Sequence, residues 1–303
     1  MHRTSLRLTL TYLSPMIVGV GLISLFPILY NVFISFTNQN LYHFRHYSIV
    51  GLVNYSKLFQ GLDADFFIVL GRTFLFVAIC IPLFLAVGMA AAMALNHPSV
   101  RFKAFWRVAL IVPWAVPSYI TALVWKFFFN EDFGTLNQIY RVFAGPKAGL
   151  PWLSDPTWAF ASIILANVWM SYPFFMVVIL GALQSIPSEL YEAAAVDGAG
   201  AWSQFRRITL PLLRPAILPA TILSAIVTFN VLNTAYLITK GGPFISAAKP
   251  GATDFVMVYA FRVAFQLFNY SYIAAFAVVI FFLLFTVTLG SLRFTGLVRE
   301  EAR

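Results

Sequence analysis

Charged residues are scarce in this sequence: Asp, Glu, Lys and Arg make up 10% of its 303 residues, whereas an ordinary soluble domain carries about 25%. So few charges could not cover the surface of a soluble protein of this length, and a disordered chain would carry more of them. Hydrophobic residues instead reach 60% and aromatic residues 17%, with a mean hydropathy of +0.83. The composition predicts a protein embedded in a lipid bilayer, and we attribute the net charge of +9 to membrane topology rather than to nucleic-acid binding.

Residues that could carry catalysis or ion coupling are also few. The single cysteine, Cys80, excludes a disulfide framework and a cysteine metal site. The four histidines and the eleven acidic residues lie outside the cores of the long apolar runs, which disfavours a histidine-based site and an ion-driven carrier. The sequence also has no GxxxxGK[ST] motif to hold nucleotide phosphates. No catalytic or metal-binding residue is therefore predicted, and the energy for any transport has to come from elsewhere.

Long apolar runs recur along the chain, and each reaches the roughly 20 residues that cross the hydrocarbon core. The runs are continuous rather than alternating, which excludes the strands of a membrane barrel. The first run is longer than the apolar region of a signal peptide and is predicted to be retained. The expected fold is an all-α membrane protein with six transmembrane helices, at about 10–36, 66–95, 104–129, 157–183, 213–238 and 268–292.

The basic residues indicate on which side of the membrane the loops lie. They are most densely packed in short segments near the span ends, at 3–7, 101–107, 206–214 and 293–303. Because Lys and Arg concentrate in cytoplasmic loops, both termini are predicted to be cytoplasmic. Within the last outer segment, the aromatic and apolar stretch 254–266 predicts a short helix along the outer interface. No linker interrupts the chain, so residues 1–303 are predicted to form a single transmembrane domain.

Neutral polar and aromatic side chains follow helical spacing in three of the predicted spans, so that each set shares one helix face. They are Trp114 and Ser118 in the third span, Asn167, Ser171 and Phe174 in the fourth, and Phe229, Asn230 and Asn233 in the fifth. Amides and hydroxyls bond to sugar hydroxyls, and aromatic rings cover the C–H faces of a sugar. The same polar groups could instead join the helices to one another. Prolines beside them, including Pro113, Pro117 and Pro173, favour kinks along a translocation path.

The connection between the fourth and fifth predicted spans, 187–211, has a pattern of its own. Ser188 is placed to cap a helix that includes Leu190–Val196, and Gly198 is placed to end it. A second short helix is predicted at about 201–208. Two short surface helices with acidic and apolar side chains would suit docking of a partner, although a plain helical loop would show the same local pattern.

This loop resembles the EAA motif of ABC importer permeases, in which E-A-A-x-x-D-G-A is followed after a spacer by I-x-L-P. The matching residues are Glu192, Ala193, Ala194, Asp197, Gly198, Ala199, Ile208, Leu210 and Pro211. The resemblance implies the type I, MetI-like permease fold and a coupling helix that docks into a separate ATP-binding subunit. The implied docking residues are Glu192, Ala193, Ala194, Asp197, Gly198, Trp202 and Phe205. ATP and Mg²⁺ would be bound by that partner, and this chain would bind no cofactor.

From about Tyr12 onward the chain is similar to the carbohydrate branch of this family, and within it to the MalF-type maltose/maltodextrin permeases. The segments that carry the similarity are 112–118, 129–134, 152–156, 167–173, 240–243, 253–254 and 259–265. The resemblance implies that the polar and aromatic residues of the three spans form a sugar site at mid-membrane. Trp114, Ser171 and Phe174 stand where the family has Tyr, Gly and Tyr, which leaves the length of the sugar open.

The resemblance also implies an assembly in a bacterial cytoplasmic (inner) membrane. Its other members would be a second, MalG-like permease, a homodimeric MalK-like ATPase and an extracytoplasmic sugar-binding protein. The expected function is ATP-driven import of an oligosaccharide by alternating access, with maltose or maltodextrin as the favoured substrate. The alternatives are a permease for another sugar or for glycerol-3-phosphate and, from other classes, an intramembrane enzyme or a passive channel.

Overall fold

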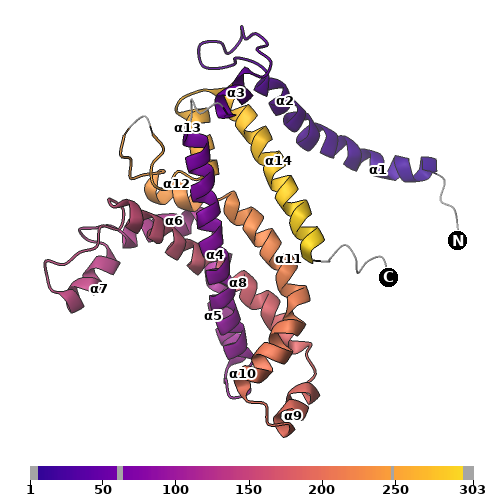
Figure 1. The fold of residues 1–303 in the computed structure, drawn as a ribbon, viewed down its shortest axis with the longest axis vertical. Coiled ribbons are helices and arrows are strands. Elements are labelled where there is room, and N and C mark those ends of the chain that lie inside the picture. The colour runs from indigo at the N-terminus through magenta and orange to yellow at the C-terminus, as the bar shows by residue number, and fades with distance from the viewer. Residues whose placement is uncertain (1–5, 60–63, 247–248, 296–303) are drawn as a thin grey trace. The chain divides into compact units, whose positions relative to one another are not determined.

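The computed structural model describes residues 6–59, 64–246 and 249–295 (Figure 1). In that part of the chain the regular structure is helical, apart from one isolated β-bridge between Thr37 and Ile49. The helices are α1 (Leu6–Val20), α2 (Phe26–Ser35), α3 (Val53–Phe59), α4 (Ala64–Asn96), α5 (Lys103–Ala115), α6 (Ser118–Phe128), α7 (Thr135–Ala144), α8 (Pro156–Gln184), α9 (Glu189–Val196), α10 (Ala201–Gln204), α11 (Leu210–Phe229), α12 (Asn233–Thr239), α13 (Val256–Phe265) and α14 (Tyr270–Thr295), with π-helical turns at Gly21–Leu25 and Phe205–Thr209.

The membrane-spanning helices agree in number with the apolar runs of the sequence. Among the described residues, five helical segments are long and apolar enough to cross a membrane, at Leu10–Ser35, Asp65–Asn96, Pro156–Gln184, Ala201–Thr239 and Tyr270–Ser291. The bent pair of α5 and α6 adds a sixth if it is counted as one span. The predicted all-helical membrane architecture is therefore confirmed.

The third span is not the continuous helix predicted over 104–129. α5 ends at Ala115, α6 begins at Ser118, and the two helices meet at an angle of 90°. Between them Val116 and Pro117 are extended, with ψ values of 131° and 134°. A proline disfavours helical backbone in the residue before it and has no N–H to donate, so Pro117 explains the break. Trp114 and Ser118 consequently lie on two helices and not on one continuous face.

The fifth span also differs from its prediction, at both ends. The short helix predicted at 201–208 is not separate, because α10 continues through the π turn Phe205–Thr209 into α11. At the other end α11 stops at Phe229, and three non-helical residues precede α12. The span therefore begins inside the connecting loop and is interrupted at 230–232.

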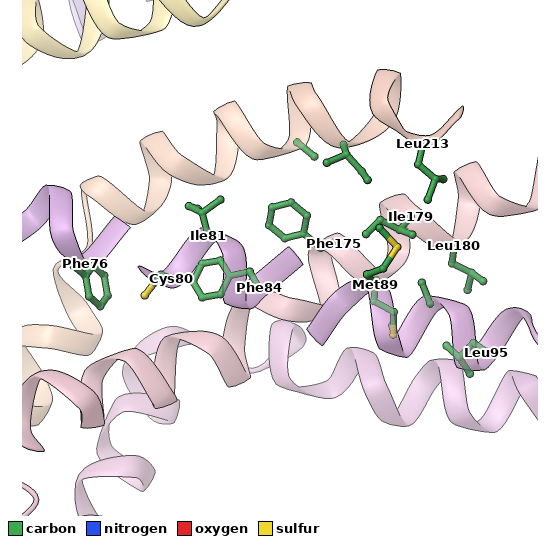
Figure 2. Packing of buried hydrophobic residues seen from close by; sticks show 14 of the residues in the cluster. Phe76, Cys80, Ile81, Phe84, Met89, Leu95, Phe175, Ile179, Leu180 and Leu213 are labelled. Atoms are coloured by element: carbon green, nitrogen blue, oxygen red, sulfur yellow. The ribbon is translucent and has the colours of Figure 1, made fainter. Parts of the chain in front are cut away.

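The described part of the chain divides into two compact units, of which the larger comprises the described residues of 65–259 and 288–303. Its core lies between α4, α8 and α11 (Figure 2). Phe76 and Phe84 of α4, Phe175 of α8 and Leu213 of α11 are among the fully or almost fully buried side chains there. Burial of large apolar side chains against one another, each worth about 1.5–3 kcal/mol, holds these three helices together.

A glycine permits the closest approach between α4 and α8. A Cβ atom on Gly88 would lie 2.6 Å from Cβ of Phe175 and 2.9 Å from the backbone nitrogen of Met176. Small residues at helix contacts in membranes allow backbones to come together in this way. Gly88 therefore sets the spacing of the two central helices.

The segment between α6 and α8 is held in place by side chains that bond to backbone groups. The Asn137 side chain accepts from the Leu150 N–H and the Trp152 indole N–H, both at 3.0 Å. At the start of α8, the Asp155 carboxylate accepts from the N–H groups of Thr157 and Trp158 at 2.8 and 3.1 Å. These bonds satisfy first-turn donors and fix where α8 begins.

The stretch 254–266 forms a helix, α13, as predicted. However, Val256, Val258 and Tyr259 in its first turns are buried, so this part packs inside the protein rather than along a membrane surface. Nearby, the Arg72 guanidinium donates to the backbone carbonyls of Pro250 and Gly251 and so holds the segment that precedes α13.

The smaller unit comprises the described residues of 1–64 and 260–287. Its loop after α2 is fixed by Asn54, whose amide donates to the carbonyls of Ser35 and Thr37 at 2.9 and 2.7 Å. Tyr55 adds a hydrogen bond of 2.6 Å between its hydroxyl and that of Ser35. The Leu41 N–H donates to the Phe268 carbonyl at 3.1 Å, which ties this loop to the start of α14.

We expect Gly88→Val to destabilise the folded protein by about 1–3 kcal/mol, because the added side chain would collide with the backbone of α8. Thermal unfolding of the purified protein in detergent measures the effect. The control is Gly71→Val on the same helix, because a Cβ atom at Gly71 meets nothing within 4 Å. Equal melting temperatures for the two variants would contradict the role given to Gly88.

Candidate functional site

The two interrupted spans meet at their breaks. Ser118 is the first residue of α6 and Asn233 is the first residue of α12. The Asn233 side-chain amide donates to the Ser118 hydroxyl at 2.9 Å, and α12 packs along α6 from this point. The first N–H groups of a helix have no acceptor within the helix. The meeting point therefore brings side-chain and backbone polar groups together within two apolar spans.

A cleft of about 230 Å³ lies in the same unit between α5, α8 and α11. Its lining consists of Trp114, Ser171, Phe174, Leu223, Ser224, Val227 and Thr228. The rings of Trp114 and Phe174 are 6.4 Å apart and inclined by 41°, so they present faces at an angle to each other. The lining thus combines two aromatic rings with three hydroxyl groups and carries no charge.

Several predicted residues come together here. Trp114, Ser171 and Phe174 line the cleft, and Ser118 and Asn233 form the hydrogen bond between the two breaks. Both features lie next to the break in the third span, because Trp114 is three residues before Pro117 and Ser118 directly follows it.

The other predicted sugar-site residues lie elsewhere. Asn167 is buried, and its amide donates to the Ile163 carbonyl of its own helix at 3.0 Å. Phe229 is buried with its ring 5.4 Å from that of Phe74. Asn230 is exposed and donates to the Ile226 carbonyl at 2.8 Å. In this structure these three are not part of the cleft.

Sequence reasoning did not identify the contribution of α11 to the cleft. Ser224 and Thr228 are four residues apart and therefore lie on one helix face, just before the predicted residues Phe229 and Asn230. The helical spacing that indicates Asn167, Ser171 and Phe174 in the fourth span also applies to these two hydroxyl residues. Leu223 and Val227 carry no such signal, because apolar residues fill most of the span.

A larger cavity of about 540 Å³ lies between α6, α7 and α8. It is lined almost entirely by apolar side chains, among them Val124, Phe128 and Leu136. A sugar buried there would lose hydrogen bonds to water without regaining them, at a cost of about 1–3 kcal/mol for each unpaired group. The smaller cleft, with its three hydroxyl groups, is therefore the better candidate for a polar ligand. Among the described residues no three His, Cys, Asp or Glu side chains gather where they could hold a metal ion.

The predicted docking loop lies at the end of α11 opposite α12 and contains the helix expected from its sequence, α9 (Figure 1). Gly198 has φ of +79°, a conformation that suits glycine. The Ala199 N–H donates to the Ala194 carbonyl at 2.8 Å and the Gly198 N–H to the Ala195 carbonyl at 3.0 Å. This pair of bonds is a Schellman motif, so Gly198 ends the helix as predicted. The predicted Ser188 cap is wrong, because Ser188 has helical backbone angles and its side chain makes no capping bond.

Most of the predicted docking residues are accessible. Glu192, Ala193, Asp197 and Gly198 are exposed and Ala194 is half-buried. Trp202 is 72% exposed, whereas Phe205 is half-buried against the core of the unit. The two rings stack with centroids 5.5 Å apart. Trp202 therefore presents an exposed apolar surface, and its ring stacks on that of Phe205, which packs against the core.

The fold, the cleft and the loop together define a membrane transport subunit. Residues 85–295 match the family of inner membrane components of binding-protein-dependent transport systems, and the chain belongs to this family. It is thus a multi-pass inner-membrane permease component of an ABC transporter and not an enzyme.

The relatives lie in the carbohydrate branch that the sequence resembles. The galactooligosaccharide transport system permease protein GanP of Bacillus subtilis is 34% identical over 283 residues, which are 92% of this chain and 68% of GanP. The maltose/maltodextrin transport system permease protein MalF of Escherichia coli is 39% identical over 220 residues, which are 71% of this chain and 42% of MalF. The chain therefore spans less than half the length of the MalF proteins that it matches.

Solved structures show the same fold. A chain of a bacterial alginate ABC transporter, solved with an alginate pentasaccharide-bound periplasmic protein, superimposes with a TM-score of 0.78 at 21% identity. The match covers 96% of this chain and 94% of that chain. A chain of the MetNI methionine ABC transporter gives a TM-score of 0.53 at 14% identity. The predicted ABC importer permease fold is confirmed.

Proposed function

We propose that this protein is the permease subunit of an ATP-driven importer for oligosaccharides, with maltose or maltodextrin as the substrate that fits best. The observation that carries the proposal is the uncharged cleft of aromatic rings and hydroxyls, in the unit where two broken spans meet. Broken helices at membrane depth are tolerated where they line a cavity, and they commonly form the substrate site of a transporter.

The chemistry of the cleft suits a neutral sugar. The rings of Trp114 and Phe174 offer apolar faces to the C–H groups of a pyranose. The hydroxyls of Ser171, Ser224 and Thr228 can each donate and accept a hydrogen bond. The lining contains no basic residue, so a glycerol phosphate would find no partner for its charge.

The size of the cleft favours a site shared with a second subunit. Its volume of about 230 Å³ is below the roughly 300–1,000 Å³ of sites that enclose a whole small ligand. A second, MalG-like permease facing the cleft would supply the remaining walls. The three predicted sugar-site residues outside the cleft, Asn167, Phe229 and Asn230, would join the site only when the helices move.

The energy source is proposed to be a partner ATPase. The exposed part of the docking loop, with Glu192, Asp197 and Trp202, would enter a groove of a MalK-like homodimer, which would bind ATP and Mg²⁺. A sugar-binding protein would deliver the substrate on the outer face, and both termini would be cytoplasmic. Closing and opening of the ATPase dimer would then move the helices around the cleft, which is a rigid-body form of alternating access.

The names of the relatives supply a specific second candidate. GanP is named for galactooligosaccharides, so a galactose-based oligosaccharide is the alternative substrate. A passive channel remains the alternative of another class, and it differs by permitting uptake without ATP.

We expect Trp114→Ala to lower ATP-dependent uptake of maltotriose about tenfold, because one of the two ring faces of the cleft is lost and about 1.4 kcal/mol corresponds to a factor of ten. Uptake of labelled sugar into proteoliposomes that contain the complete transporter measures this. Trp106→Ala is the matched control, since Trp106 is on the same helix but outside the cleft. Equal uptake by the two variants would contradict the proposed site. If the wild type prefers galactotriose to maltotriose, the galactose-based substrate is favoured. Uptake without ATP would favour a passive channel.

We expect Gly198→Val to release the ATPase subunit from the purified complex while the spans remain inserted. A β-branched residue at φ of +79° is strained by about 1–2 kcal/mol or more, so the end of α9 would change. Co-purification of the ATPase measures the loss. Gly200→Val is the control, because Gly200 has φ of −67° and neither position has an atom within 4 Å of an added Cβ. Full retention of the ATPase by Gly198→Val would refute the docking assignment.

A further inference from the structure

We propose that the hydrogen bond between Tyr191 and Thr209 is the tie through which the docking helix α9 moves α11 and thereby the sugar cleft. The proposal rests on the function proposed above and assigns Tyr191 and Thr209 as positioning residues for coupling. Neither residue touches the cleft or belongs to the exposed docking set.

The bond joins the middle of the loop to the base of a span. The Tyr191 hydroxyl lies 2.9 Å from the Thr209 hydroxyl. Thr209 is 5% exposed and directly precedes α11, and Tyr191 is half-buried on α9. Fourteen residues farther along α11, Leu223 begins the part of the helix that lines the cleft. A movement of α9 that is passed to Thr209 therefore enters the helix that carries one wall of the cleft.

The chain between α9 and α11 is a longer route for such a movement than the direct bond between Tyr191 and Thr209. Between α9 and α10 the chain runs through Gly198 and Gly200, where an added Cβ would meet nothing within 4 Å, so neither glycine packs against a neighbouring segment. A further bond, from the Gln204 side chain to the Ala199 carbonyl at 3.0 Å, ties this turn to α10. The Tyr191–Thr209 bond joins α9 itself to the residue that precedes α11, so that the two helices would move together.

The start of α11 also has features at which helices bend. The Leu210 N–H donates to the Phe205 carbonyl, five residues back, in a π turn. Pro211 and Pro215 follow, and neither has an N–H to donate to the preceding turn. Helices bend at π turns and at prolines, and π turns are frequent at functional positions. Thr209 is the last residue of the π turn, so the tie acts at the point where α11 can pivot.

The test measures the number of sugar molecules imported per ATP hydrolysed by the complete transporter in proteoliposomes. Tyr191→Phe and Thr209→Val each remove one hydroxyl and keep the shape of the side chain. We expect each variant to retain the ATPase subunit and to lower the ratio about threefold to tenfold, the factor that corresponds to one lost hydrogen bond. The double variant should be no worse than either single variant, and Thr209→Ser should restore the ratio because it keeps the hydroxyl.

The matched control is Tyr55→Phe, which removes the 2.6 Å bond between the Tyr55 and Ser35 hydroxyls in the smaller unit. It should leave the ratio unchanged. An unchanged ratio in Tyr191→Phe, or an equal fall in Tyr55→Phe, would overturn the proposed tie while wild-type uptake still supports the function. Loss of the ATPase subunit from Tyr191→Phe would also overturn it, since the bond would then serve docking alone. A wild type that imports no sugar with ATP would instead overturn the proposed function.

Discussion

The constraint on which the site depends is the conformation that Pro117 imposes within an apolar span. Val116 and Pro117 are extended, so α5 ends at Ala115 and α6 leaves at 90°. Proline favours such a break because it disfavours helical backbone in the residue before it and has no N–H to donate. Polar backbone groups are thereby freed at membrane depth, where they need partners. The second interrupted span meets this break, and Asn233 donates to Ser118 across it. Trp114, which lines the cleft, is the next-to-last residue of α5 before this break.

The same unit connects this cleft to the docking loop through one helix. α11 carries Ser224 and Thr228 in the cleft and begins at the π turn that follows Trp202. The tight contact of α4 and α8 at Gly88 gives this helix a fixed support. Proline and π geometry then concentrate bending at the base of α11 rather than in the packed core.

The sequence was sufficient for the architecture, and its limits have physical reasons. Continuous apolar runs and loop chemistry identified the spans, the helix α9 and the role of Gly198, because these depend on length and local backbone preference. The break at Pro117 was expected only as a kink, since the angle depends on packing partners far along the chain. Asn167 and Phe229 follow the correct spacing, but tertiary packing turns them into the interior. The hydroxyls of α11 could have been found by the spacing rule alone.

The most direct test of a sugar site at the two breaks is cross-linking of Ser118→Cys with Asn233→Cys in the reconstituted transporter, with Cys80 replaced by Ala. Because the native side chains are 2.9 Å apart, a short thiol cross-linker should join the two positions in the absence of sugar. Excess transported sugar should slow the reaction, because Ser118 and Asn233 are among the residues predicted to bind the sugar. The comparison pair is Ser118→Cys with Asn230→Cys, because the Asn230 amide donates to the Ile226 carbonyl of its own helix and not to Ser118. Failure of the first pair to cross-link, or a rate that sugar does not change, would contradict a substrate site at this point.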